Sequence, residues 1–255
     1  MTEAIRHVFT DPNARIVVAH RGNRIAAPEN TLESLGDAVE LGADAIEFDV
    51  RVTRDGVPMI LHDAELDRTT NGHGRLNAYT FDDVRTLNAA ARVPSRTGGR
   101  LQIPSLEEVL DRFRETPLVI EVKELEAAEP TETLIRRFAA QERVLIGSSN
   151  NAVTERFYRS GLRACASARD ASIMIPLAFF GVALGKPRYD VLSITPSFHG
   201  FPVPVQRMAA AARKAGIATQ VWTVNDPAAA RRLWTAGVSG IVTDDPAAMI
   251  RARAG

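Results

Sequence analysis

Short apolar runs alternate with longer amphipathic stretches from one end of the chain to the other. The runs are rich in β-branched residues and predict strands, whereas the apolar spacing of the longer stretches is typical of helices. The predicted strands are residues 16–20, 45–50, 118–123, 144–147, 163–167, 190–194, 219–223 and 240–243. The predicted helices are residues 31–41, 105–114, 131–141, 153–159, 205–215, 227–236 and 246–253. Strands that alternate with helices in this way indicate βα units and a parallel sheet.

Three of the predicted helices begin with recognisable start signals. Asn30 precedes the helix at 31–41, and Asp226 precedes Pro227 at the start of the helix at 227–236. Ser105 is followed three residues later by Glu108, which is the pattern of a capping box. Side chains of this kind accept hydrogen bonds from the first N–H groups of a helix, so they predict where these three helices begin.

The number of predicted strands distinguishes between two α/β folds. Eight strands with intervening helices in 255 residues are typical of a closed (β/α)8 barrel, the TIM barrel, formed by a single domain over residues 1–255. A doubly wound open sheet more often has a glycine-rich phosphate turn after its first strand, and here the turn His20-Arg21-Gly22-Asn23 has one glycine. The long connection after the second strand predicts a small insertion at about residues 64–104.

Composition narrows the classes of function. Apolar residues make up 45% of the chain, which is enough for a full-sized buried core. The 31 basic side chains balance the 31 acidic ones, and this neutral net charge argues against a nucleic-acid partner. A lone cysteine, Cys165, cannot form an internal disulfide, so a cytoplasmic location is expected. The longest apolar stretch, residues 171–185, is too short to span a membrane, which predicts a soluble protein. Weak contact with lipid is still compatible with this pattern.

Polar residues gather where predicted strands end, which is where a barrel has its active site. Glu47 and Asp49 are two apart on one strand and therefore project to the same face, here the barrel interior. With Glu121 one strand over, they form an oxygen-ligand set for a divalent cation such as Mg²⁺ or Ca²⁺, with Mn²⁺ also allowed. The alternative is that these acids form structural ion pairs with nearby basic residues, namely Arg21, Arg51 and Lys123.

A hairpin turn brings a histidine back to these acids. Asp55-Gly56 is a strong two-residue turn, and if it forms the whole loop, Asp49 lies opposite His62. His20 closes the first strand, so two imidazoles border one carboxylate cluster as a candidate acid/base pair.

Two cationic residues and two further residues, one aromatic and one an amide, complete the candidate site. Arg21 and Lys123 supply positive charge that suits a phosphate, and the whole set is typical of phosphate-ester cleavage. Trp222 either forms an apolar wall for substrate or packs at the barrel mouth. Asn225 either binds substrate or caps the helix that follows.

The chain resembles the glycerophosphodiester phosphodiesterase family through ten short motifs in family order, which span nearly its whole length. The motifs are His20-Arg21-Gly22, Pro28-Glu29-Asn30-Thr31, Glu47-x-Asp49, Thr53-Arg54-Asp55-Gly56, His62-Asp63, Arg68-Thr69-Thr70, Ile103-Pro104-Ser105-Leu106, Glu121-Val122-Lys123, Trp222-Thr223-Val224-Asn225 and Thr243-Asp244-Asp245-Pro246.

The resemblance implies a TIM barrel that cleaves glycerophosphodiesters to sn-glycerol 3-phosphate and an alcohol. It implies His20 and His62 as catalytic residues and phosphate contacts by Arg21 and Lys123, with Trp222 against the glycerol end. The residues implied as metal ligands are Glu47, Asp49 and Glu121. Glu29 and Asn30 are expected to organise the first loop. We assign His20 as the base and His62 as the acid.

Three other functions stay open. One is a phospholipase D-type lyase that stops at a cyclic phosphate, and another is a barrel that binds phosphodiesters without catalysis. The third follows from the apolar residues 173–184, which predict a helix packed on the barrel or a subunit contact. Alternatively, they form an apolar patch that admits acyl chains, as in a lysophospholipase D-like enzyme.

Overall fold

The computed structural model describes residues 8–93, 98–180, 187–198 and 200–254. Its main sheet is parallel and has the strand order β5-β4-β2-β1-β10-β9-β6. These strands are β1 (Ile16–His20), β2 (Ala45–Val52), β4 (Leu118–Val122), β5 (Val144–Gly147), β6 (Val191–Ile194), β9 (Ala218–Val221) and β10 (Gly240–Thr243). Each of the seven overlaps a predicted strand.

The predicted strand at 163–167 is present only as a short bridging segment. The N–H of Cys165 donates to the carbonyl of Ile146 at 2.8 Å, and the N–H of Ala166 donates to that of Val191 at 2.8 Å. This segment thus lies between β5 and β6 and joins the two ends of the sheet, although single bridges replace a full ladder. The sheet nearly closes, and the predicted (β/α)8 barrel is confirmed.

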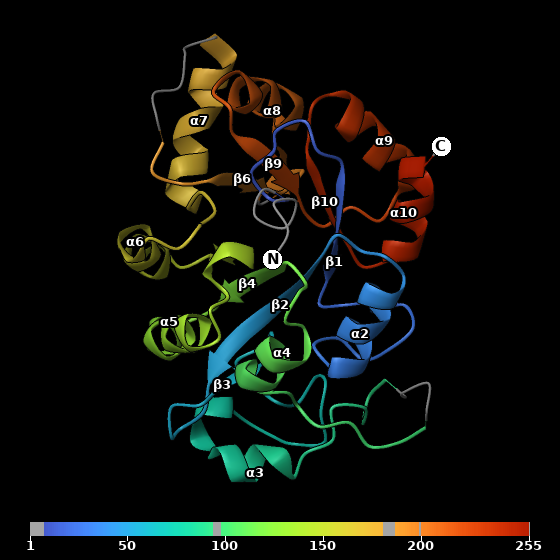
Figure 1. The fold of residues 1–255 in the computed structure, drawn as a ribbon, viewed down its shortest axis with the longest axis vertical. Helices are drawn as coiled ribbons and strands as arrows, with labels where there is room; N and C mark the ends of the chain where they lie inside the picture. The colour runs from blue at the N-terminus through green and yellow to red at the C-terminus, as the bar shows by residue number, and fades with distance from the viewer. Residues whose placement is uncertain (1–7, 94–97, 181–186, 199, 255) are drawn as a thin grey trace.

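Helices cover the outside of the barrel (Figure 1). They are α2 (Leu32–Glu40), α4 (Leu106–Arg112), α5 (Ala128–Arg137), α6 (Asn151–Ser160), α7 (Ala168–Phe180), α8 (Val205–Lys214), α9 (Pro227–Thr235) and α10 (Pro246–Ala254). Two large apolar clusters fill the space between sheet and helices, and a third lies inside the barrel around Ile16, Val18 and Val191. The interior is therefore packed below the strand ends, which leaves only those ends for a site.

The apolar residues 173–184 fall partly within α7. Met174 is buried in the cluster beneath this helix, so the predicted helix packed on the barrel is confirmed for its described part. Residues 181–184 lie outside the described residues. No helix in the described ranges is long and apolar enough to cross a membrane.

Two of the three predicted helix starts are confirmed, and one is shifted. Ser105 and Glu108 form the predicted capping box of α4, and Asp226 caps α9 ahead of Pro227. The cap of α2 is Thr31, whose side chain accepts from the N–H of Ser34, so the prediction of Asn30 was wrong. Asn30 instead adopts a positive φ of 57°, and its side-chain amide donates a hydrogen bond to Asp49.

The hairpin after β2 has a three-residue loop, so the predicted two-residue turn was wrong. β3 (Pro58–Ile60) pairs antiparallel with β2 and places Val50 opposite Ile60, while the N–H of Thr53 donates to the carbonyl of Val57. Gly56, at φ 82°, takes the left-handed position that such loops need. The register is therefore shifted by one residue, and Leu61 rather than His62 lies opposite Asp49.

The segment between β3 and α4 forms the expected excursion from the barrel. It contains a 3₁₀ turn at Leu76–Ala78 and the short helix α3 (Phe81–Arg85). A small apolar cluster of its own, which includes Leu66 and Val84, packs it against β3. The excursion lies outside the ring of helices in Figure 1, and His62, which precedes it in the chain, lines the cavity.

Replacing Gly22 with alanine is expected to destabilise the protein by about 2–4 kcal/mol. Gly22 has φ 83°, and a Cβ there would lie 2.5 Å from the backbone carbonyl carbon of Ser34. Gly36 is the matched control, because nothing lies within 4 Å of its Cβ position in α2, and G36A should be neutral or stabilising. Urea unfolding of both variants tests this, and equal free energies of unfolding would contradict it.

Candidate active site

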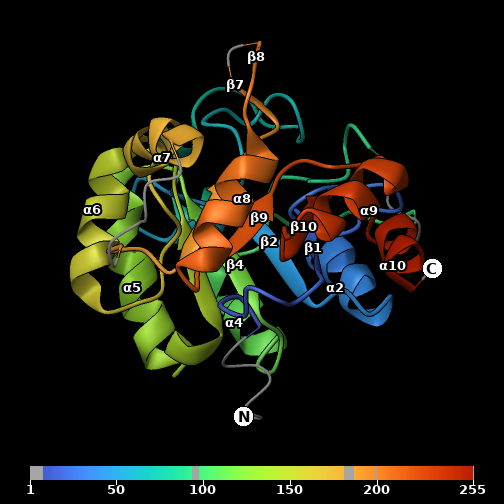
Figure 2. The same cartoon turned by 90° about the horizontal axis from the view of Figure 1, so that it is seen from above.

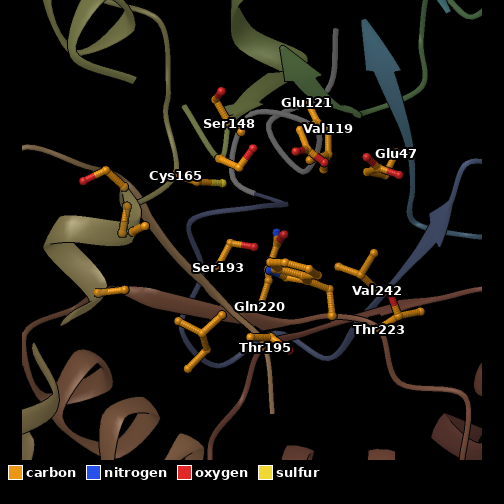
Figure 3. Close-up of a pocket in the computed structure, with 18 of the residues that line it drawn as sticks. Glu47, Val119, Glu121, Ser148, Cys165, Ser193, Thr195, Gln220, Thr223 and Val242 are labelled. Atoms are coloured by element: carbon orange, nitrogen blue, oxygen red, sulfur yellow. The ribbon is translucent and has the colours of Figure 1, made fainter. Parts of the chain in front are cut away.

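A cavity of about 530 Å³ opens at the carboxyl ends of the strands. Figure 3 shows Glu47 and Glu121 pointing into it from one side, with Cys165, Ser193 and Gln220 on other walls. His20, Arg21, His62, Lys123 and Trp222 also line it. The structure thus brings seven of the predicted site residues to the cavity wall. Asp49 lies directly behind this wall, and Asn225 does not line the cavity.

The three acids form one cluster. Glu47 and Asp49 project from β2, and the parallel pairing of β2 with β4 places Glu121 beside Asp49. One carboxylate oxygen from each residue lies within 4.8 Å of the other two. Asp49 and Glu47 are buried, whereas Glu121 is partly exposed to the cavity. This is the convergence predicted from the period of two along β2.

Two cations hold the deepest of these acids. The Nζ of Lys123 lies 2.8 Å from an oxygen of Asp49 and 2.7 Å from one of Glu121. The other oxygen of Asp49 lies 3.1 Å from Nε of Arg21 and accepts a hydrogen bond of 2.8 Å from the amide of Asn30. Burial raises the pKa of Asp49, but these partners outweigh burial and lower it.

The alternative that these acids form structural ion pairs with nearby basic residues therefore applies to Asp49 and Glu121. Arg21 and Lys123 pair with its acids, whereas Arg51 pairs with Glu124 at 3.0 Å. Glu47 accepts a hydrogen bond from the backbone N–H of Arg21, and in the described part of the chain no Lys or Arg side chain forms an ion pair with it.

The donor chemistry of the cluster fits a divalent cation. Burial, together with the charges of Asp49 and Glu121, raises the pKa of Glu47 to about 7. A buried carboxylate with this raised pKa is stabilised when a cation neutralises it. Three oxygen donors in one cluster match the ligand preference of Mg²⁺, Mn²⁺ and Ca²⁺, so these residues fit a metal of that group.

Each histidine is held by a carboxylate through its Nδ1 atom. For His20 the partner is Asp244, whose oxygen lies 2.7 Å from Nδ1. Burial lowers the pKa of His20, but the hydrogen bond to Asp244 and the charge of Glu47 outweigh burial, so the pKa is raised. Asp244 is itself fixed by Arg24 at 2.9 Å and by the amide of Asn225 at 2.8 Å.

For His62 the partner is its neighbour Asp63, at 2.6 Å from Nδ1, and Arg68 forms an ion pair with the other oxygen of that carboxylate. Burial lowers the pKa of His62, and Lys123 and Arg21 lower it further. The opposing effects of Asp49 and Asp63 do not compensate, so the pKa of His62 stays below its usual value. In both residues the bond at Nδ1 leaves Nε2 as the nitrogen for chemistry.

Glu29 links the two sides of the site. Its carboxylate forms ion pairs with Arg21, Arg24 and Arg68, at 3.0, 3.0 and 2.8 Å. Burial raises its pKa, but the three guanidinium groups outweigh burial and lower it. Glu29 and Asn30 thus both contact site residues.

The carboxylate partners of the two histidines were not predicted from the sequence. Asp244 and Asp63 appear there only within motifs, although Asp244 directly follows β10, at the end of the barrel that carries the site. That position is the signal that points to it. Asn225 neither caps α9 nor contacts the cavity wall, since its amide holds Asp244. Cys165 is buried, and burial raises the pKa of its thiol to about 12.

Comparison with known proteins identifies the family. The model of the glycerophosphoryl diester phosphodiesterase family matches residues 20–248. A glycerophosphodiester phosphodiesterase from Caldanaerobacter subterraneus is 30% identical over 252 residues, which cover 92% of this chain and 96% of that protein. The crystal structure of glycerophosphodiester phosphodiesterase from Agrobacterium tumefaciens has a TM-score of 0.77 at 27% identity, and the match covers 93% of this chain and 99% of that one.

A second solved structure adds a ligand. It is a phosphodiesterase from Oleispira antarctica in complex with the product sn-glycerol 3-phosphate, with a TM-score of 0.76 and 26% identity, and the match covers 95% of this chain and 98% of that one. The fold, the ordered motifs and the family model agree over most of the chain. This protein belongs to the glycerophosphoryl diester phosphodiesterase family.

Proposed function

We propose that this chain hydrolyses glycerophosphodiesters to sn-glycerol 3-phosphate and an alcohol. The observation that supports this most is the convergence of three acids, two carboxylate-held histidines and two cations on one cavity. The relative from Oleispira antarctica was solved with sn-glycerol 3-phosphate, and we extend that product to this chain.

In this proposal Glu47, Asp49 and Glu121 hold one divalent metal ion. Bound there, the ion neutralises the buried carboxylates and withdraws charge from the phosphoryl group. Arg21 and Lys123 line the same cavity and bind phosphate oxygens through their N–H groups, which orients the diester. The ligands are all oxygen atoms, which suit Mg²⁺, Mn²⁺ and Ca²⁺ alike, so the assay below is designed to identify the ion.

The two histidines move the protons. A raised pKa favours the protonated form of His20 and suits a general acid, whereas a lowered pKa favours the neutral form of His62 and suits a general base. We therefore propose the reverse of the sequence-based assignment. His62 takes the proton of the attacking glycerol 2-hydroxyl at Nε2, and His20 gives a proton to the oxygen of the leaving alcohol. In the second step, in which water opens the cyclic phosphate, the two roles are exchanged.

The test uses chelated enzyme and a panel of glycerophosphoalcohols that includes the choline and ethanolamine diesters. We expect chelation to abolish turnover and one restored ion among Mg²⁺, Mn²⁺ and Ca²⁺ to return it, because the three acids alone provide no substitute for its charge. Phosphorus NMR should show glycerol 3-phosphate as the final product. A cyclic phosphate as the end product would identify a lyase, and binding without turnover would identify a catalytically silent barrel.

A further inference from the structure

The cavity has a charged half and an uncharged half. In the part of the chain that the structure describes, the acids and bases on its wall are His20, Arg21, Glu47, His62, Glu121 and Lys123. Five of the six lie on β1, β2 and β4 or directly follow β1 and β4, and the sixth, His62, lies two residues after the end of β3. The phosphate therefore belongs in this half, and a second charged group has no partner in the opposite half.

The opposite half contains an apolar arm, by which we mean Ala168, Ala171, Ile175, Ile194, Val203 and Met208. The first three lie on α7, and Ile194 ends β6. Carbon atoms make up most of the cavity wall. At about 530 Å³ the cavity is in the range of roughly 300–1,000 Å³ that holds drug-sized ligands, so it has room beyond the phosphate and glycerol.

Exposed aromatic side chains mark the mouth of this half. Trp222 and Phe198 line the cavity with 45% and 59% of their surface exposed. Phe198 belongs to the hairpin of β7 (Ser197–Phe198) and β8 (Phe201–Pro202), which projects from the barrel in Figure 2. Phe201, opposite Phe198 in this hairpin, is 76% exposed and lies outside the cavity wall. An apolar mouth that continues into an apolar arm favours a hydrocarbon over water.

A buried amide points into the same cavity. Gln220 on β9 is 1% exposed, and neither its amide oxygen nor its amide nitrogen has a hydrogen-bond partner among the described residues. Figure 3 shows its side chain pointing into the cavity beside Ser193. An unpaired buried amide is unfavourable until a partner arrives, so Gln220 favours a ligand with a hydrogen-bonding group in addition to its phosphate.

We propose that the substrates of this site are single-chain glycerophospholipids, with the hydrocarbon chain in the apolar arm and the ester carbonyl accepting a hydrogen bond from Gln220. This inference rests on the proposed function and names its substrate class. In the reaction with lysophosphatidylcholine, the free 2-hydroxyl forms a P–O bond and loses its proton to His62, while the P–O bond to choline breaks and choline leaves with a proton from His20. Water then forms a new P–O bond as the bond from phosphorus to the 2-oxygen breaks, and that oxygen regains a proton. The products are choline and 1-acyl-glycerol 3-phosphate.

Wild-type enzyme with its restored ion is assayed on glycerophosphocholine and on octanoyl-lysophosphatidylcholine below its critical micelle concentration. We expect kcat/KM to be at least about tenfold higher for the acylated substrate, because each buried methylene adds to binding. Equal or lower kcat/KM for the acylated substrate would overturn the inference while turnover of glycerophosphocholine upholds the proposed function. No turnover of either substrate would overturn both.

Two variants test whether the exposed aromatic hairpin at the cavity mouth contributes to turnover of the acylated substrate. F201S should lower kcat/KM for palmitoyl-lysophosphatidylcholine about fivefold and leave that for glycerophosphocholine unchanged, since Phe201 lies outside the cavity wall. The control is L41S, because Leu41 is 41% exposed and follows α2, at the amino-terminal end of the barrel strands. Equal effects of the two variants on the acylated substrate would contradict a role for the hairpin.

The amide is tested by changing protein and substrate together. An alkyl-ether analogue of lysophosphatidylcholine lacks the carbonyl, so wild-type enzyme should prefer the ester about tenfold. In Q220L this preference should vanish, whatever the variant does to the absolute rates. A preference that persists in Q220L would show that Gln220 does not bind the ester.

Discussion

The variant E47Q is expected to lose turnover of glycerophosphocholine by roughly 10³-fold, because a bound metal contributes several kcal/mol to stabilising the transition state. Glu47 is buried and has no Lys or Arg ion pair among the described residues, so its charge is available for a metal. The amide of glutamine has nearly the same shape but no charge. Titration calorimetry of the metal-free variant should show weaker metal binding, and a coupled assay for choline should show the loss of turnover.

The control variant is E124Q, which removes a carboxylate from the same end of the barrel. Glu124 pairs with Arg51 and accepts from the N–H of Val52, away from the acid cluster, so turnover should stay within a fewfold of wild type. Wild-type affinity and turnover in E47Q would show that the cluster is not the metal site.

Unfolding of metal-free E47Q separates loss of metal from loss of fold. The pKa of Glu47 in the folded protein is raised to about 7, above its ordinary value of 4.5, so the ionised form opposes folding. This residue's contribution to stability is thus lost as pH rises from about 4.5 through about 7. Metal-free E47Q should therefore be at least as stable as wild type at pH 8 by urea unfolding.

The acid cluster could be predicted because it depends on backbone periodicity alone. Residues two apart on a strand face the same side, and parallel strands end at the same edge, so Glu47, Asp49 and Glu121 had to converge once the strands were correct. His62 reached the cavity despite the error in register. It lies two residues after the last residue of β3, and the shift of one residue leaves it at the same end of the barrel.

The charge network around the histidines could not be predicted in the same way. Asp244 contacts His20 across 224 positions of sequence, and this contact depends on which direction two side chains take after their strands end. Glu29 is reached by three arginines whose long side chains follow no local periodicity. The contribution of α7 to the cavity wall could not be predicted either. Apolar spacing predicts that a helix packs against the barrel, but it does not predict that part of the packed face borders a cavity.

The pH dependence of kcat/KM is expected to be bell-shaped, with an acidic limb from His62 and a basic limb from His20. Activity should rise as pH increases through the lowered pKa of His62, which must lose a proton to act as base. It should fall as pH increases through the raised pKa of His20, which must keep its proton to act as acid. H62A and H20A should each lose roughly 10²–10⁴-fold in rate and should each lose only their own limb.

The isosteric variants D244N and D63N test the cause of each limb. Removing the charge of Asp244 removes its electrostatic attraction for the protonated ring and weakens the hydrogen bond that raises the pKa of His20, so the basic limb should move to lower pH by about one to two units. D63N should instead move the acidic limb to lower pH, because Asp63 raises the pKa of His62. If D244N moves the acidic limb and D63N the basic one, His20 is the base. Because each carboxylate touches one imidazole, the pair of variants decides between the two assignments even if both rates fall.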